Sequence, residues 1–234
     1  MHLQLLAGPQ WPLVFINALS RFSGVNMKLS VKVKQDEFTE KVAQAFDLNF
    51  NGVIETDIPS FEVPNSNSFS IGLIVGSSGS GKSTILNSLG LPVSGNEIKW
   101  NPDTAIVSHF DSPDEAIEKL HACGLASIPT LCKPYHVLSN GEKYRAKFAR
   151  LLGSDLVLDE FTSVVNRETA KSLCVSVSKY VRKKDLKNIV LASCHRDIIN
   201  WLQPDWVFDC DTGQKFENDN VKENLNRVAR ITIG

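Results

Sequence analysis

The sequence predicts an α/β fold in which a mostly parallel central sheet is covered by helices. One observation is that short apolar runs, typical of buried strands, alternate with longer segments that repeat apolar residues at helical spacing. Another is a glycine-rich turn that joins the apolar run at 71–75 directly to a helical segment at 83–89. The length of 234 residues suits one large domain of this class, or a domain with a small appendage.

The predicted strands are of two kinds. Residues 29–34 alternate apolar and polar side chains, which indicates a strand with one exposed face. The other segments are more uniformly apolar, which favours strands that are buried on both faces. These segments are residues 71–75, 104–107, 156–158, 188–193, 206–208 and 228–233.

The predicted helices begin at residues that can cap a first turn. Asp36 and Ser112 each precede a segment of helical spacing, and Ser112 is followed by a proline and two acids. Ser139 and Glu142 have the spacing of a capping box. After Asn166, the residues between 170 and 181 form one apolar stripe of about three helical turns.

Composition excludes several classes of protein. The formal net charge of −1 provides no overall electrostatic attraction for DNA, RNA or an anionic membrane. The five cysteines are scattered without C-x-x-C spacing, which argues against a disulfide framework or a zinc site and predicts a cytoplasmic protein. No apolar run reaches the length of a membrane span.

Residues 76–84 match the phosphate-binding pattern G-x-x-x-x-G-K-[ST] without a mismatch. Glycines allow several backbone N–H groups of such a turn to converge on one anion. Lys82 would reach the β- and γ-phosphates, and the Ser83 hydroxyl would ligate Mg²⁺. The competing interpretation is a Gly/Ser turn that binds nothing, which the preceding strand and following helix disfavour. The predicted binding residues are Gly76, Ser77, Ser78, Gly79, Ser80, Gly81, Lys82, Ser83 and Thr84.

Two further strands end in residues that suit phosphoryl transfer. Asp159 and Glu160 follow the apolar run at 156–158. An acid at that place can supply the carboxylate that Mg²⁺ needs, and Glu160 could orient or deprotonate the attacking water. His195 ends the next strand, where a polar residue would lie near the γ-phosphate. Alone, each is a weak signal, since a solvated acid or a structural histidine is the commoner case.

With these motifs in order, the chain resembles an ABC-type ATPase over about residues 60–210. Residues 138–142 read L-S-N-G-E, where the family signature usually reads L-S-G-G-Q. Residues 159–167 and 201–209 resemble, more narrowly, a soluble subgroup that is fused to or associated with a predicted acetyltransferase domain.

The resemblance implies a head-to-tail homodimer that holds two ATP molecules. Each ATP would lie between the P-loop of one chain and Ser139 and Gly141 of the other. Lys82, Glu160 and His195 would be catalytic, and Ser83 and Asp159 would hold Mg²⁺. The implied organisation is an N-terminal extension at residues 1–26 and an ABC-type ATPase domain at 27–234, with a reduced helical subdomain because residues 84–138 contain one convincing helix.

Three departures from the family pattern bear on hydrolysis. His109 stands at or beside the place of a Mg²⁺-binding glutamine, and a neutral imidazole is a poor Mg²⁺ ligand. Asn166 replaces an aspartate of the dimer interface, and Asn140 and Glu142 alter the signature. The prediction is hydrolysis of ATP in a soluble cytoplasmic complex, with an acetyltransferase or a nucleic-acid-processing partner. The alternatives are the ATP-binding subunit of a membrane transporter and a nucleotide-dependent dimer switch with little hydrolysis.

Two weaker interpretations remain open at this point. Phe50 is the candidate for an aromatic that stacks on adenine, with a place in the core as the competing interpretation. The basic segment at residues 179–184 is either a nucleic-acid contact or a solvated helix end favoured by the helix dipole.

Overall fold

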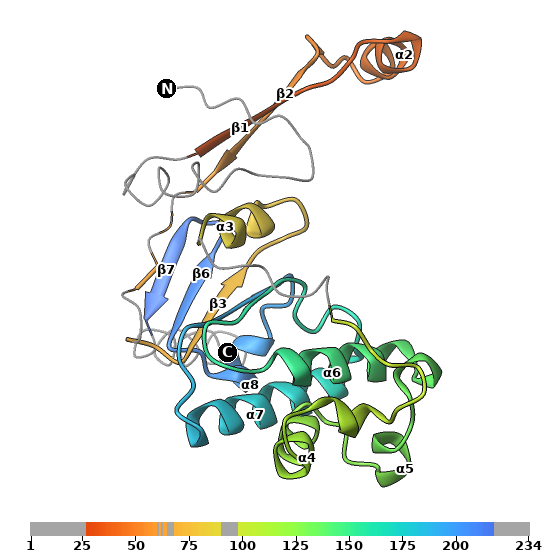
Figure 1. Ribbon diagram of the computed structural model, residues 1–234. Coiled ribbons are helices and arrows are strands. Elements are labelled where there is room, and N and C mark those ends of the chain that lie inside the picture. Colours follow the sequence, from red (N-terminus) through yellow and green to blue (C-terminus); the bar gives the residue numbers. More distant parts are fainter. Residues whose placement is uncertain (1–26, 60, 62, 65–67, 90–97, 218–234) are drawn as a thin grey trace, which may run out of the picture. The chain divides into compact units, whose positions relative to one another are not determined.

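The computed structural model describes residues 27–59, 61, 63–64, 68–89 and 98–217 (Figure 1). The chain divides into two compact units, Met1–Glu62 and Val63–Gly234. The predicted extension at residues 1–26 and the predicted strand at 228–233 lie outside the described residues. Each unit is described by itself.

The first unit contains a two-stranded antiparallel sheet and one helix. Strand β1 (Met27–Lys32) pairs with β2 (Val53–Ile58), and helix α2 (Glu37–Ala45) lies between them in sequence. The Asp36 carboxylate accepts the N–H of Thr39 at 2.9 Å, and the Thr39 hydroxyl accepts the N–H of Asp36 at 2.9 Å. This capping box confirms the predicted start of the helix.

The second unit is built on a five-stranded sheet of order β4-β5-β3-β6-β7. The first four strands are parallel and β7 runs antiparallel to β6, so the predicted mostly parallel sheet is confirmed. Strand β3 lies at the centre and all of its residues are buried. The strands are β3 (Ile71–Val75), β4 (Val157–Leu158), β5 (Ile189–Ser193), β6 (Trp206–Asp209) and β7 (Gln214–Glu217).

The register of the central strands brings three turns to one edge of the sheet. Val75, the last residue of β3, is aligned with Ser193 of β5 and with Asp209 of β6. The segments that follow these residues therefore leave the sheet at the same level. In open parallel sheets this carboxyl edge is where ligands bind.

Helices α4, α5 and α6 of the second unit lie in the sequence between α3 and strand β4. Figure 1 shows α4, α5 and α6 gathered beside the long helix α7. Helix α7 carries the predicted apolar stripe on its buried face. The helices are α3 (Lys82–Ser88), α4 (Pro113–Ala122), α5 (Ile128–Leu131), α6 (Asn140–Leu151), α7 (Arg167–Lys183) and α8 (Ile198–Leu202).

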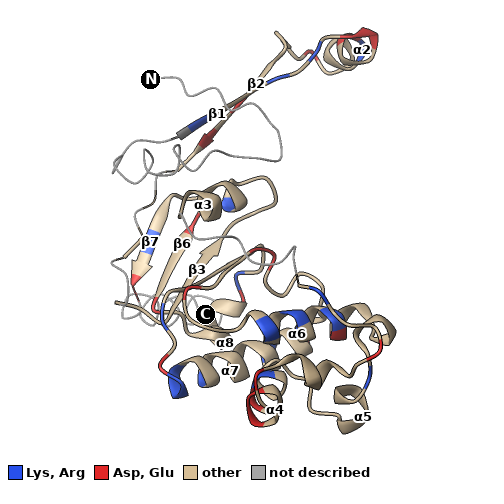
Figure 2. Ribbon diagram, viewed as in Figure 1, with Lys and Arg blue, Asp and Glu red and all other residues tan. Residues whose placement is uncertain are grey.

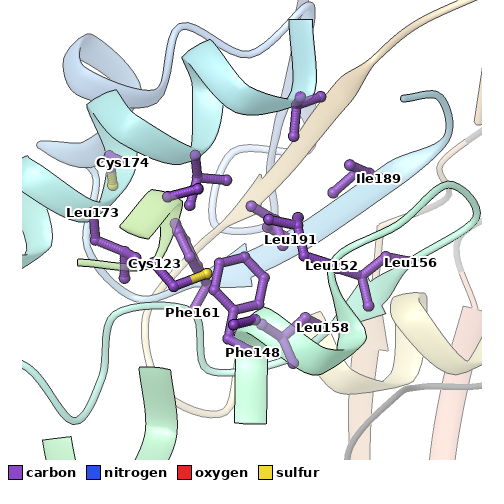
Figure 3. Packing of buried hydrophobic residues seen from close by; sticks show 14 of the residues in the cluster. Cys123, Phe148, Leu152, Leu156, Leu158, Phe161, Leu173, Cys174, Ile189 and Leu191 are labelled. Carbon is purple, nitrogen blue, oxygen red and sulfur yellow. The ribbon is translucent and has the colours of Figure 1, made fainter. Parts of the chain in front are cut away.

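The hydrophobic core joins these helices to the sheet. Phe148 of α6 and Phe161, which follows β4, are fully buried, and their ring centroids lie 5.4 Å apart (Figure 3). Leu173 of α7 and Leu191 of β5 belong to the same cluster. Burial of each phenylalanine contributes about 2 kcal/mol by the area removed from water. The core thus fixes the segment after β4, which carries Glu160.

The prediction of a strand at residues 104–107 is wrong. Residues Ile106–His109 form a short 3-10 helix, and Ala105 makes only an isolated bridge to Pro134. A ladder cannot extend there because proline has no N–H to donate, and because the carbonyl oxygen of Ala105 is bonded to the ring of His109. A short apolar run has no periodicity that would distinguish these conformations.

Candidate nucleotide-binding site

The turn after β3 has the glycine conformations of a phosphate-binding loop. Gly79 and Gly81 have φ values of 81° and 92°, a region that other residues adopt at a cost. Gly76 is required for a different reason, because a Cβ atom there would lie 2.9 Å from the Cβ of Cys210. Helix α3 then begins at Lys82, and no side chain caps its first turn. The backbone N–H groups at this start are therefore available to an anion.

Lys82 lies folded into the turn. Its ammonium donates to the carbonyl oxygens of Gly76 and Ser77 at 2.9 and 2.6 Å. Two of the three ammonium donors thus hold the loop, and a phosphate oxygen would take the third. The backbone of the loop therefore fixes the position of the ammonium that would bind the phosphates.

Ser83 and Asp159 meet across the site. The Ser83 hydroxyl donates to Oδ2 of Asp159, and Oδ1 of Asp159 accepts the N–H of Glu160 at 2.7 Å. A hydroxyl and a carboxylate oxygen thus converge from different elements. This donor set fits Mg²⁺, which takes one or two protein oxygens and completes its shell with phosphate oxygens and water.

Glu160 lies in a turn whose backbone is strained. Glu160 and Thr162 have φ values of 55° and 71°, and such a conformation is unusual for a β-branched residue such as Thr162. Phe161, between them, is fully buried and donates its N–H to the carbonyl of Ala192 at 2.7 Å. This anchor holds the turn and leaves the Glu160 side chain exposed.

His195 is connected to the segment after β4. Its Nδ1 lies 3.4 Å from the Thr162 hydroxyl, and its backbone N–H donates to Oγ of Ser193 at 3.1 Å. Thr162 also donates its N–H to the hydroxyl oxygen of Tyr144 at 3.2 Å, where burial raises the pKa of the phenol. The chain of contacts runs from α6 through Thr162 to His195.

His109 has both ring nitrogens engaged. Nδ1 lies 2.9 Å from the carbonyl oxygen of Ala105, and Nε2 accepts the N–H of Asn101 at 3.0 Å. Nε2 also lies 3.2 Å from the Thr104 hydroxyl. A neutral ring with its proton on Nδ1 satisfies all three contacts. The His109 ring therefore stabilises the loop formed by residues 101–109.

The signature segment forms the predicted capping box. The N–H and hydroxyl of Ser139 donate to Oε2 of Glu142 at 2.9 and 2.8 Å, and the Glu142 N–H donates to Oγ of Ser139 at 3.4 Å. Gly141 lies in the first turn of α6. Within the part of one chain that the structure describes, neither Ser139 nor Gly141 is hydrogen-bonded to the P-loop.

Asn166 caps helix α7, because its Oδ1 accepts the N–H of Thr169 at 2.8 Å. An asparagine caps a helix as well as an aspartate does, so the substitution preserves the local structure. Compared with the aspartate of the family pattern, Asn166 carries no negative charge at the start of α7.

Sequence reasoning did not single out three charged residues beside the P-loop. Asp211 accepts hydrogen bonds from Ser77, and Arg196 contacts both Asp209 and Asp211. Asp209 ends the segment at residues 201–209 that resembles the soluble subgroup, but nothing in the local sequence marks Arg196 or Asp211. Their meeting depends on the register of β3, β5 and β6, which a single sequence does not reveal.

The basic segment at the end of α7 is partly neutralised (Figure 2). Lys183 and Lys184 pair with Glu118 of α4 at 3.7 and 2.5 Å, and Arg182 pairs with Asp205 at 3.1 Å. A nucleic acid would have to compete with these carboxylates for the basic side chains. The structure therefore does not support a nucleic-acid contact at this segment.

Two solved structures match this chain over most of their own length. One is the dimeric structure of MJ0796, a bacterial ABC transporter cassette, with 15% sequence identity and a TM-score of 0.51; the match covers 72% of this chain and 93% of that chain. The other is the ATP-binding cassette MJ0796 in a dimeric post-hydrolysis state with ADP and Pi, with 16% identity, a TM-score of 0.51, and coverage of 81% and 96%. This chain has the fold of an ABC-type nucleotide-binding domain.

The ABC-type fold confirms the fold class that the sequence predicts. Among residues 98–138, the structure has α4, the short α5 and two 3-10 turns, in agreement with a reduced helical subdomain. None of the helices in the described residues is long and apolar enough to cross a membrane. No protein-family model and no curated protein matches the chain.

Proposed function

We propose that this chain binds MgATP and hydrolyses it as an ABC-type ATPase. The observation that carries the proposal is the contact between Ser83 and Asp159 beside the P-loop, where Lys82 lies folded. Lys82 and the loop N–H groups bind the phosphates, and Ser83 and Asp159 hold Mg²⁺. The metal supplies neutralisation of the charge that develops on the transferred phosphoryl group.

Glu160 and His195 supply the remaining groups. The exposed carboxylate of Glu160 orients or deprotonates the attacking water, and the strained turn places it at the carboxyl edge of the sheet. His195, whose Nδ1 faces Thr162, offers the other side of its ring to the γ-phosphate. Phosphoryl transfer requires positioning and charge neutralisation more than covalent chemistry, which suits this set.

The active unit in this proposal is a head-to-tail homodimer. Ser139 and Gly141 lie at the start of a helix of 12 residues and have no hydrogen bond to the P-loop among the described residues of one chain. A second copy would bring this start against the γ-phosphate. Both matching structures are described as dimers, which supports the arrangement by analogy of fold.

We place this dimer in a soluble cytoplasmic complex, because the reduced helical subdomain offers less surface for membrane subunits than the larger subdomain expected of transporter cassettes. One of the two matching structures is described as a transporter cassette, which keeps a transporter subunit as the alternative. An acetyltransferase partner has no support from the comparisons. A switch with little hydrolysis is a second candidate, because both ring nitrogens of His109 are engaged within its own loop.

ATP binding, turnover and dimerisation of matched variants test the proposal. Lys82→Ala should abolish nucleotide binding, and Glu160→Gln should bind ATP, dimerise and turn over at least tenfold more slowly. Lys171→Ala, which alters an exposed lysine of α7, is the matched control and should behave as wild type. Equal and near-zero turnover in wild type and Glu160→Gln, with ATP-dependent dimerisation intact, would identify the switch. Unchanged nucleotide affinity in Lys82→Ala would reject ATP binding at this loop.

A further inference from the structure

We propose that Arg196, Asp209 and Asp211 form a polar clamp that positions the P-loop at Ser77 and fixes the backbone beside His195. The clamp would act as a positioning device for nucleotide binding and turnover. This inference rests on the proposed function, because the loop that the clamp holds is the one assigned to the phosphates of ATP.

Strand register explains why these residues meet. Val75 is aligned with Ser193 and with Asp209, so the segments that follow β3, β5 and β6 lie next to one another. Ser77 and Asp211 are each two positions beyond an aligned residue. Arg196 is three positions beyond Ser193 and directly follows His195. The clamp therefore belongs to the carboxyl edge of the sheet, where the nucleotide is proposed to bind.

Both the backbone N–H and the backbone carbonyl of Ser77 form hydrogen bonds to side chains. The Asp211 carboxylate accepts the Ser77 N–H at 3.0 and 3.2 Å and the Ser77 hydroxyl at 2.8 Å. On the other side, the Ser77 carbonyl accepts the Lys82 ammonium at 2.6 Å. Any movement of Ser77 away from Asp211 would therefore also move the group that positions Lys82. This sequence of contacts connects a surface aspartate to the main phosphate-binding cation.

Arg196 fixes Asp211 in turn. Its Nε and Nη2 bond the two carboxylate oxygens of Asp209 at 3.0 and 2.9 Å, and Nη2 bonds Asp211 at 2.5 Å. The Asp211 N–H donates to Oδ1 of Asp209 at 2.9 Å. A lysine would keep the positive charge, but its single ammonium nitrogen cannot reproduce the paired Nε and Nη2 hydrogen bonds of the planar guanidinium to Asp209.

The alternative is that these contacts only stabilise the turn between β6 and β7. The side chains of Arg196, Asp209 and Asp211 are 45%, 14% and 30% exposed, so solvent screens each pair and moderates its contribution. A stabilising role alone would lower the melting temperature and leave nucleotide affinity unchanged. The positioning role predicts a change of affinity in variants that remain folded.

The test uses the full chain and measures ATP and ADP dissociation constants, steady-state kinetics and the melting temperature. Asp211→Asn removes the charge that binds Arg196 and should raise both dissociation constants roughly fivefold to tenfold, the range expected for a partly exposed charged hydrogen bond. Arg196→Lys should lower kcat more than it raises KM, because it loosens the backbone beside His195. In the double variant the effects should be smaller than their product, since both changes break one network.

Arg182→Lys is the matched control, because Arg182 forms a comparable pair with Asp205, whose side chains are 40% and 25% exposed. It should leave affinity and kcat within about twofold of wild type. Folded Asp211→Asn and Arg196→Lys proteins that bind and turn over ATP like the control would overturn the clamp and leave ATP binding established. A wild type that binds no MgATP would instead reject the proposed function, and the clamp with it.

Discussion

The hydroxyl of Ser139 donates to the carboxylate of Glu142, with 2.8 Å between Oγ and Oε2. The signature serine thus contacts a negative charge at the place where the proposed dimer brings a γ-phosphate. The N–H and hydroxyl of Ser139 lower the pKa of Glu142, so this carboxyl stays ionised near neutral pH. Closure of the dimer would have to overcome repulsion between this carboxylate and the phosphate.

Glu142→Gln should therefore strengthen ATP-dependent dimerisation. The amide has nearly the same shape and can still accept the Ser139 N–H, while the repulsion is removed. We expect dimers at about tenfold lower ATP concentration, measured by sedimentation in the Glu160→Gln background, as one like-charge contact of roughly 1.4 kcal/mol would give. Glu142→Ala, the control, loses the cap and should lower the melting temperature. Weaker dimerisation in Glu142→Gln would contradict this account.

His109→Ala should reduce stability without changing Mg²⁺-dependent ATP affinity. The ring accepts the N–H of Asn101 and contacts Thr104 and Ala105, and its loss removes these hydrogen bonds, at a cost of about 1 kcal/mol. Thermal unfolding and ATP titration with and without Mg²⁺ check the two parts. His121→Ala, at an exposed position of α4, should change neither. If His109→Ala lowered the Mg²⁺-dependent affinity for ATP without changing the melting temperature, His109 would instead be a Mg²⁺ ligand.

Asp211 should contribute stability that is lost in acid. Arg196 and Ser77 lower the pKa of its carboxyl from 3.8 to about 2. A carboxyl whose pKa is lower in the folded state stabilises the fold above its unfolded pKa and ceases to do so as pH falls through about 2. We expect Asp211→Asn to be less stable by about 1 kcal/mol at pH 7, after a discount for solvent screening, and this difference should vanish near pH 2. A difference that persists at pH 2 would show another cause.

Only two of the five cysteines should react rapidly with an alkylating reagent in the native protein. Cys132 and Cys194 are exposed, whereas Cys123, Cys174 and Cys210 are buried. Burial raises the pKa of Cys210 to about 11 and that of Cys174 to about 12, so their thiols are protonated at pH 8. Mass spectrometry of iodoacetamide-treated protein should find two modified residues, and all five after denaturation. Rapid native labelling of Cys210 would contradict the packing beneath the P-loop.

The sequence predicted those parts of the site that depend on short-range patterns. The glycine-rich turn before the helix at Lys82, the helix cap at Asp36 and the capping box at Ser139 depend on local spacing, and the structure has each of these local elements at the expected position. The strand at 104–107 failed because an apolar run of this length has no distinctive period. Asp211 and the strained turn at Thr162 could not be predicted, because they depend on strand register and on packing around Phe161.

Gly72 and Trp206 are aligned neighbours in β3 and β6, and the indole occupies the space where a side chain at position 72 would stand: a Cβ atom there would lie 2.6 Å or less from the ring. The combined volume of the two side chains is therefore set by the spacing of the strands. A larger residue at position 72 would therefore require a smaller one at position 206. We expect the residues at these two positions to vary together wherever the same two strands pair in this register.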